Sequence, residues 1–312
     1  FRRVLFRSVK VGVVGVGHMG KEHARIYAES SKAELVGVYD TDPHTAKKIA
    51  DKHRTRVFAT LAEMVDATEA VSVVTPTLNH LASAEPFLRK GRHVLVEKPI
   101  AMDTKEAREL VNLAEKNGAK LAVGHVERFN PVLAALEERL GRPRFIEAHR
   151  LSPYPGRSTD IGVVMDLMIH DLEIILHLVR SPVTSVDAVG VPVLSKGEDI
   201  ANARIRFENG CVANITTSRI SPEKLRKIRV FQDDAYLSLD YMKQEGEIYR
   251  RVDGKITRDK IPVQKGEPLK NQLEEFLDNV RHDTDPRVAG THGFEALQLA
   301  SRICEQMTPV GK

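Results

Sequence analysis

The chain has 312 residues, 42% of them hydrophobic and 29% charged, a profile typical of a globular protein with about two domains. Its net charge of +4 owes most to Phe1–Ser8, which contain three of the 47 basic residues and no acid, so the rest has 44 basic against 43 acidic side chains. This near balance, without a stripe of Lys and Arg, argues against nucleic acid as a partner.

Three further features limit the class of protein. Phe1–Ser8 resembles translated sequencing-adapter read-through, or else is a short disordered arm, and is excluded from the fold. No apolar run reaches the roughly 18–20 residues of a membrane span, so no membrane partner is expected. Cys211 and Cys304 form neither a CxxC pair nor a zinc spacing. We therefore expect buried thiols, no metal and a cytoplasmic protein.

Residues 9–124 alternate short Val-rich runs with helical segments. The expected strands are Val9–Val16, Ala33–Tyr39, Val57–Phe58, Ala70–Val74, His93–Val96 and Leu121–Val123. The expected helices are Lys21–Ser30, Pro43–Lys52, Leu61–Asp66, Asn79–Lys90 and Thr104–Asn117. Such alternation predicts a parallel sheet covered on both faces, which is a doubly wound α/β domain of the Rossmann type.

Residues 125–312 have a different pattern and are expected to form a second domain. Its expected helices are Pro131–Leu140, Val163–Val179, Leu269–Arg281 and Gly293–Met307. Its expected strands are Arg144–Leu151, Val183–Val193, Ala201–Phe207, Cys211–Arg219, Lys227–Phe231, Ala235–Asp240 and Gly246–Arg251. Asn209-Gly210 indicates a hairpin. Consecutive strands without intervening helices predict an α/β domain with a large, open, mostly antiparallel sheet.

A GxGxxG motif, Gly15-x-Gly17-x-x-Gly20, lies between the first expected strand and the first helix. The first glycine of such a motif makes a tight turn, the second lets the backbone approach a pyrophosphate, and the third lets the helix pack closely. The N–H groups from His18 and Met19 onward would face the phosphates. The alternative is a glycine-rich turn without a ligand. Because the motif has this context, we interpret it as a dinucleotide site.

Asp40 ends the second expected strand, where the adenosine ribose would lie. A carboxylate accepts a hydrogen bond from the 2′-hydroxyl but repels a 2′-phosphate, and no Arg follows it directly. The sequence therefore favours NAD over NADP. Asp42, beside Pro43, is interpreted as a helix N-cap instead.

Two further loops follow strands at the edge where open α/β sheets bind ligands. One contains Thr75, Pro76 and His80, and the other is Glu97-Lys98-Pro99. His80 lies either against the cofactor or on the surface at the start of a helix. Lys98 either points into the crevice that holds the nicotinamide or is a solvated lysine, and its position favours the first interpretation.

Asp166 and His170 are four residues apart in an apolar helix and so share one face. They form either a structural pair or part of a catalytic site, and the dinucleotide motif favours catalysis. Oxidation of a sugar hydroxyl needs a hydride acceptor, a base and a cation beside the developing alkoxide. NAD, His170 and Lys98 would supply these, while Asp166 orients the hydroxyl or binds its neighbour.

In their order and spacing, Gly15-x-Gly17-x-x-Gly20, Glu97-Lys98-Pro99 and Asp166-x-x-x-His170-Asp171 resemble the Gfo/Idh/MocA family of oxidoreductases over nearly the whole chain. The resemblance implies a Rossmann domain, then an α/β domain whose open sheet mediates dimer or tetramer contacts. It also implies that Lys98, Asp166 and His170 occupy the family's catalytic positions. One departure is Val126, where many members have a polar residue.

The stretch 124–131, GHVERFNP, is similar to the branch of this family that acts on UDP-linked amino sugars such as UDP-N-acetylglucosamine. This similarity implies oxidation of the ring C3 hydroxyl. Arg128, Arg150 and Arg157 are candidates for contact with the diphosphate and Asp171 for contact with the sugar. The alternative for each arginine is a surface or salt-bridged position.

Two other functions stay open. One is a dehydrogenase of free sugars or inositol, and the other is an NAD-binding sensor without catalysis. The run of strands has too few helices to cover both faces of a sheet. We therefore expect a homodimer or homotetramer built on its exposed face.

Overall fold

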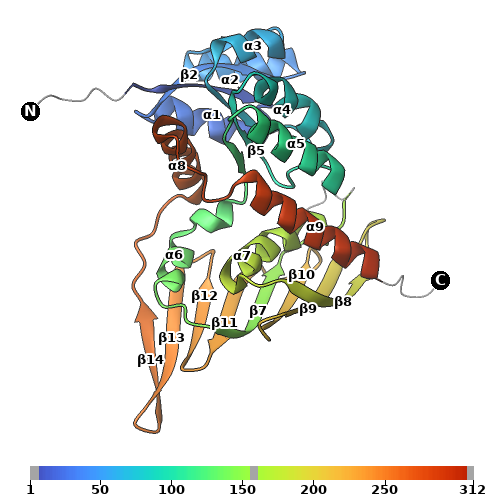
Figure 1. Cartoon of the computed structure of the whole chain (residues 1–312), viewed down its shortest axis with the longest axis vertical. Helices are drawn as coiled ribbons and strands as arrows, with labels where there is room; N and C mark the ends of the chain where they lie inside the picture. The colour runs from blue at the N-terminus through green and yellow to red at the C-terminus, as the bar shows by residue number, and fades with distance from the viewer. Residues whose placement is uncertain (1–6, 155–160, 308–312) are drawn as a thin grey trace, which may run out of the picture. The chain divides into compact units, whose positions relative to one another are not determined.

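The computed structural model describes residues 7–154 and 161–307, which divide into two compact units (Figure 1). The first unit contains the residues up to Val126 together with Leu269–Phe294, and the second contains Glu127–Pro268 and the residues from Glu295 onward. The sequence assigns Leu269–Phe294 to the second domain, whereas its contacts group it with the first. Within the described ranges, no helix is both long and apolar enough to cross a membrane.

The first unit is built on a six-stranded parallel sheet, as its Val-rich runs predict. Its strands are β1 (Val9–Val14), β2 (Ala33–Tyr39), β3 (Arg56–Val57), β4 (Ala70–Val73), β5 (His93–Val96) and β6 (Leu121–Val123). Their order is β3-β2-β1-β4-β5-β6, so the direction of winding reverses between β1 and β4. In doubly wound sheets the carboxyl ends of the strands at such a reversal form the ligand crevice.

Helices cover both faces of this sheet. They are α1 (Gly20–Glu29), α2 (Pro43–His53), α3 (Leu61–Ala67), α4 (His80–Arg89), α5 (Thr104–Lys116) and α8 (Pro268–His282), with a short 3-10 turn η1 (Thr77–Asn79) before α4. Helix α8 buries Leu273, Phe276 and Leu277 in the same apolar core as β1 and α1. This burial of an i, i+3, i+4 stripe explains why α8 belongs to the first unit. Asp42 caps α2, as expected, by accepting the N–H of His44.

The second unit is built on an eight-stranded sheet. Its strands are β7 (Pro143–Leu151), β8 (Val183–Val191), β9 (Ile200–Phe207), β10 (Val212–Ser218), β11 (Leu225–Gln232), β12 (Ala235–Asp240), β13 (Glu245–Val252) and β14 (Lys255–Ile261). Their order is β14-β13-β12-β11-β7-β10-β9-β8, and only the β7–β10 pair is parallel. Strand β14 is absent from the sequence prediction, although Asp253-Gly254 marks its hairpin.

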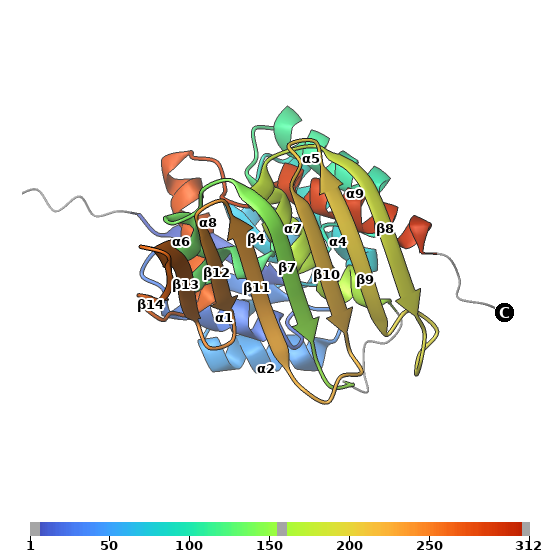
Figure 2. The same ribbon diagram turned by 90° about the horizontal axis from the view of Figure 1, so that it is seen from below.

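One face of the eight-stranded sheet packs against helices. They are the 3-10 turn η2 (Val126–Phe129), α6 (Pro131–Glu137), the π turn η3 (Val164–Met168) and α7 (Ile169–Val179). The last helix, α9 (Gly290–Gln306), contains the boundary between the units. The inward side chains of β7 and β11, such as Ile146 and Ile228, are fully buried. Figure 2 shows the other face, which no described helix covers.

The sequence predicts one regular helix for the segment with Asp166 and His170, but the structure differs from this prediction. The segment begins with the π turn η3, in which the N–H of Ile169 donates to the oxygen of Val164, and continues as α7. Asp166 lies in the π turn and His170 in the first turn of α7. Single π turns inside helices are rare and are frequently found at functional sites.

Candidate active site

The loop between β1 and α1 has the geometry of a dinucleotide cradle. Gly15 has a φ of +83°, and a Cβ there would lie 2.8 Å from the oxygen of Val74. A Cβ on Gly20 would lie 1.9 Å from the oxygen of Gly15, so α1 begins directly against the loop. A Cβ on Gly17 would have no atom within 4 Å, which leaves open space where a pyrophosphate would approach. These residues therefore fit a dinucleotide.

The remaining predicted contacts of this loop lie around it. His18 and Met19 are exposed and precede the first turn of α1. The carboxylate of Asp40 accepts the N–H of Val16 at 2.8 Å and the N–H of Asp42 at 2.9 Å. It thus braces the glycine loop, and each oxygen has a further lone pair for a ribose hydroxyl.

The loops after β4 and β5 lie at the same edge of the sheet, because these strands are parallel neighbours. Thr75 is half-buried and Pro76 exposed. His80 connects the two loops, with Nδ1 2.9 Å from the oxygen of Pro99 and Nε2 3.0 Å from the oxygen of Thr75. It does begin α4, but it is 1% exposed, so the alternative of a surface histidine is wrong.

Glu97 and Lys98 follow β5 and are both half-buried. The Lys98–Pro99 peptide bond is cis. The Glu97 carboxylate lies 3.4 Å from Nε2 of His23 on α1 and also accepts the N–H of Lys98. Sequence reasoning missed His23. Its signal is a histidine three residues after the last glycine of the motif, on the buried side of α1.

In the second unit, the loop between β8 and β9 holds the start of the π turn. The N–H of Val163 donates to the backbone oxygen of Glu198, and the N–H of Val164 donates to its carboxylate, both at 3.1 Å. The neighbouring Asp199 is fully buried and accepts from Nε of Arg219 at 2.8 Å. Asp166 and His170 themselves are half-buried. Sequence reasoning missed this support because it comes from residues remote in the chain.

Two of the arginines predicted to contact a diphosphate are buried in ion pairs. Arg150 donates two hydrogen bonds to Asp171, at 2.8 and 3.0 Å, and one to Glu127 at 3.2 Å. Arg128 donates to Glu173 at 2.8 Å. Both guanidinium side chains are 3% exposed, so the geometry does not support their contact with a diphosphate, nor that of Asp171 with the sugar.

The same ion pairs form a buried network around α7. Burial raises the pKa of Glu173 to about 7, although its partner Arg128 acts to lower it. The Arg128–Glu173 pair connects η2 to α7, and the pair formed by Arg150 connects β7 to α7, so both elements are held against the helix that carries His170. Arg157, the third predicted arginine, lies outside the described residues.

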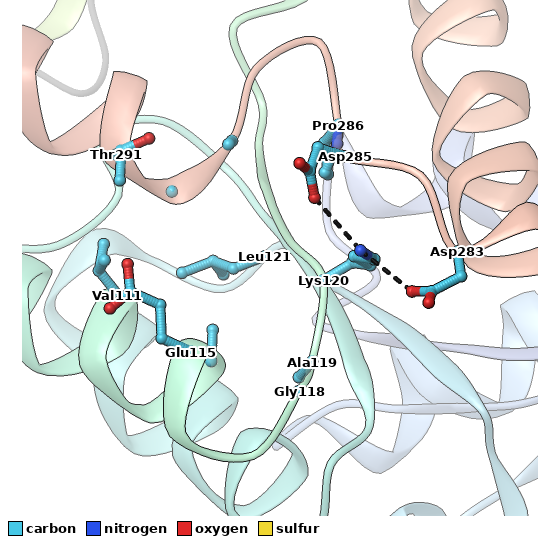
Figure 3. A pocket seen from close by; sticks show the side chains of 13 residues that line it. Val111, Glu115, Gly118, Ala119, Lys120, Leu121, Asp283, Asp285, Pro286 and Thr291 are labelled. Atoms are coloured by element: carbon cyan, nitrogen blue, oxygen red, sulfur yellow. Dashed lines mark hydrogen bonds and ion pairs between the residues drawn. The ribbon is translucent and has the colours of Figure 1, made fainter.

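A groove of about 490 Å³ lies elsewhere in the first unit (Figure 3). It is lined by the end of α5, the start of β6 and the segment between α8 and α9. Lys120 crosses it, with Nζ 3.1 Å from Asp283 and 3.2 Å from Asp285. The groove lies at the amino end of β6, opposite the carboxyl ends that carry the glycine loop, so it is not part of the cofactor crevice.

Two other expectations concern cysteines and metals. Cys211 is buried and Cys304 is half-buried, and burial raises their pKa values to about 11 and about 12. Both are therefore protonated thiols at neutral pH. Among the described residues, no group of three His, Cys, Asp or Glu side chains could hold a metal ion.

Both parts of the chain match domains of one family. Residues 9–125 match the GFO_IDH_MocA oxidoreductase family with its NAD-binding Rossmann fold, and residues 134–238 match the GFO/IDH/MocA C-terminal domain. A UDP-N-acetylglucosamine 3-dehydrogenase from Acidithiobacillus ferrooxidans is 37% identical over 302 residues, covering 95% of this chain and 96% of that one. An inositol 2-dehydrogenase from Rhizobium meliloti is 27% identical over 94% of this chain and 95% of its own.

Solved structures agree with these matches. The structure of the Acidithiobacillus ferrooxidans enzyme has a TM-score of 0.92 at 36% identity and covers 96% of this chain and 98% of its own. A levoglucosan dehydrogenase in complex with NADH and levoglucosan shares the fold, with a TM-score of 0.86 at 17% identity, covering 96% of this chain and 97% of its own. The matches over both units, joined to the Rossmann strand order, show that the chain belongs to the Gfo/Idh/MocA family of NAD-binding oxidoreductases.

Proposed function

We propose that this oxidoreductase uses NAD to oxidise the C3 hydroxyl of a UDP-linked amino sugar, with UDP-N-acetylglucosamine as the first substrate to test. The observation that carries the proposal is the 37% identity, over almost the whole of both chains, to the Acidithiobacillus ferrooxidans enzyme of that name. The dinucleotide cradle at Gly15–Gly20 supports it independently, because the reaction needs a bound hydride acceptor.

Each proposed catalytic residue supplies one part of this chemistry. Bound NAD supplies the hydride acceptor. The imidazole of His170 takes the proton of the sugar hydroxyl, because a neutral imidazole is a competent base near neutral pH. The ammonium of Lys98 stabilises the alkoxide that develops as this proton leaves. Asp166 orients the reacting hydroxyl or binds the one beside it.

The proposed cofactor contacts divide between phosphate and sugar. The N–H groups of the glycine loop, including those of His18 and Met19, would hold the pyrophosphate. Asp40 would accept from the adenosine ribose, while Thr75, Pro76, His80 and Glu97 shape the nicotinamide end. Replacing Asp40 with Ser removes a negative charge from the 2′ position, so we expect the ratio of kcat/KM for NADP to that for NAD to rise. An unchanged ratio would show that Asp40 does not set the cofactor preference.

The test follows the absorbance of reduced nicotinamide with purified protein, NAD, and either UDP-N-acetylglucosamine or myo-inositol. We expect reduction with the UDP-sugar, and a loss of at least about 100-fold in kcat for Lys98→Met and His170→Asn with unchanged circular dichroism. UDP-N-acetylglucosamine carrying deuterium at C3 should give deuterated reduced nicotinamide, and a C4-labelled control should not. Label transferred from C4 instead would refute the C3 assignment.

A free sugar or inositol is the second candidate substrate, and two observations favour it. Arg128 and Arg150 are committed to buried carboxylates, so neither offers a cation to a diphosphate. The inositol 2-dehydrogenase relative covers nearly the full chain as well. Reduction of NAD by myo-inositol but not by the UDP-sugar would decide for it. Reduction by neither, with protein freed of any bound cofactor, would favour the non-catalytic sensor.

The open face of the eight-stranded sheet supports a homodimer or homotetramer. An aromatic row crosses it through Phe145, Phe231, Tyr236 and Tyr249, with successive ring centroids 5.6, 4.6 and 4.9 Å apart. No described helix covers this row (Figure 2). The four side chains are half-buried, and a second copy would bury the row fully between two sheets, since aromatic surface of this kind marks contact surfaces. Light scattering should give an oligomer, and a monomer at micromolar concentration would contradict the assignment.

A cytoplasmic location is the last part of this proposal. Its support is Cys211 and Cys304, which are free thiols, as is typical of a reducing compartment. Recovery of the native protein in the soluble cytosolic fraction is the expected result of cell fractionation. Recovery from the periplasm or culture medium would contradict it.

A further inference from the structure

Two buried histidines hold the backbone on either side of Lys98. Glu97, which precedes the lysine, contacts His23 of α1, and Pro99, which follows it, contacts His80 of α4. Both histidines are at most 1% exposed. The lysine therefore projects from a short segment that is anchored at both ends by helices on different sides of the strand.

The carboxylate of Glu97, just before the lysine, occupies a narrow slot between His23, the backbone of Lys98 and Gly124. Oε1 of Glu97 lies 3.4 Å from Nε2 of His23, and Oε2 accepts the backbone N–H of Lys98 at 3.2 Å. A Cβ on Gly124, just after β6, would lie only 2.7–2.9 Å from this carboxylate, so the slot exists because Gly124 has no side chain.

The charge of Glu97 supports the same arrangement. Burial alone would raise the pKa of Glu97, but the neighbouring His23 and Lys98 side chains outweigh burial and lower the pKa below its usual value. The carboxylate therefore stays ionised at neutral pH. An ionised carboxylate is a stronger acceptor for the N–H of Lys98 than a neutral one.

The contact after the lysine joins two loops. Nδ1 of His80 lies 2.9 Å from the oxygen of Pro99, and Nε2 lies 3.0 Å from the oxygen of Thr75, which follows β4. Burial lowers the pKa of His80, so its ring is neutral and has one N–H to donate. The ring lies between the loops after β4 and β5, and its single N–H donates either to the oxygen of Pro99 or to that of Thr75.

We propose that His23 and His80 are positioning residues of the active site, which hold Lys98 in place by anchoring Glu97 and Pro99. They act through these neighbours and do not touch the reacting atoms. The proposal deepens the function proposed above, because it assumes that Lys98 takes part in hydride transfer. A displacement of a reacting group by about 1 Å can lower a rate about 100-fold, so anchors of this kind control kcat.

The test at position 80 compares two amides. The side-chain nitrogen of Asn occupies the place of Nδ1 and can still donate to Pro99, whereas that of Gln occupies the place of Nε2 and reaches only Thr75. We expect His80→Asn to keep at least about tenfold more kcat than His80→Gln. At position 23 the order should reverse, because His23→Gln retains the contact with Glu97 and His23→Asn loses it.

This crossed order separates positioning from general stability. The exposed His282 at the end of α8 supplies the control, His282→Gln. For the five variants and the wild type, kcat and KM for NAD are measured per folded molecule, and Tm is recorded in parallel. We expect kcat to follow the crossed order without a parallel order in Tm. If the two amides at each position are equivalent, or if kcat only follows Tm, the proposal is overturned.

A second readout needs no substrate and therefore stays informative if the proposed reaction is wrong. Acetylation of Lys98 by acetic anhydride, followed by mass spectrometry over a range of pH, reports how accessible and how basic its amine is. We expect the acetylation profile to shift in His80→Gln and His23→Asn but to stay near wild type in the matched amides. Identical profiles in all four variants would show that the histidines do not position the lysine.

Discussion

The buried ion pair between Arg150 and Asp171 should contribute strongly to the stability of the second unit. Arg150 lies on β7 and donates two hydrogen bonds to Asp171 of α7 and a third to Glu127. In Arg150→Met the side chain keeps its approximate length but loses its charge. Asp171, 2% exposed, would then remain buried without the cation that now binds both of its oxygens.

The size of the effect follows from the burial of both partners. Removing one partner of a buried pair costs about 3–5 kcal/mol, because the remaining charge is desolvated and uncompensated. For a chain of 312 residues, that corresponds to a fall in Tm of roughly 5–8 °C. A matched control is Lys265→Met, since Lys265 pairs with Glu245 at 3.5 Å but both side chains are more than 60% exposed. We expect the control to lose about 0–1 kcal/mol.

The free energy of unfolding of both variants is measured by urea unfolding followed by far-UV circular dichroism. The dependence of this free energy on urea concentration, the m value, shows whether the variants unfold by the same mechanism. The double variant Arg150→Met/Asp171→Leu also removes the carboxylate of Asp171 and should recover part of the loss, because Asp171 is then no longer buried without its partner, while Glu127 keeps its contacts with Asn130 and Arg226. If Arg150→Met is no less stable than Lys265→Met, or if the double variant loses more than the single one, the reasoning about this pair is wrong.

Two further predictions concern the glycine loop and pH. Gly17→Ala should weaken NAD binding at least about tenfold in calorimetry without lowering Tm, because its Cβ meets only open space where the pyrophosphate approaches. Gly20→Ala should lower Tm, because its Cβ would lie 1.9 Å from the oxygen of Gly15. Equal effects of the two variants on Tm would contradict this reasoning. Glu173 has a pKa near 7 in the folded protein, above its usual 4.5, so it contributes stability that is full below pH 4.5 and lost as the pH rises through 7. The loss is about 3 kcal/mol at most, and Glu173→Gln should flatten this part of the curve of unfolding free energy against pH. The same slope in both proteins would show that another group titrates.

Much of the first unit could be predicted from local patterns alone. Nearly continuous Val-rich runs alternating with helices indicate buried parallel strands, because each pattern reflects which sides of an element are buried. The glycines of the motif indicate the dinucleotide cradle, because the turn requires the absence of a side chain at each position for a different steric reason. These glycines are Gly15, Gly17 and Gly20. The family resemblance rests on such motifs, which lie within short stretches of chain and need no knowledge of the fold.

The partners of buried charges were decided only by the tertiary structure. An arginine suits a phosphate and a carboxylate equally well, so nothing in the neighbourhood of Arg128 or Arg150 reveals which it meets. Their partners Glu173 and Asp171 lie 45 and 21 residues further along the chain.

The packing of helices was decided in the same way. The apolar stripe of α8 predicts that the helix packs, but not that it joins the core of the first unit. The sequence places His80 at the start of a helix, a position that is often exposed. Only the folded structure shows that the loop after β5 covers its side chain. Local sequence determines which residues avoid or require water, whereas the identity of the partner depends on long-range contacts that form only when the chain folds.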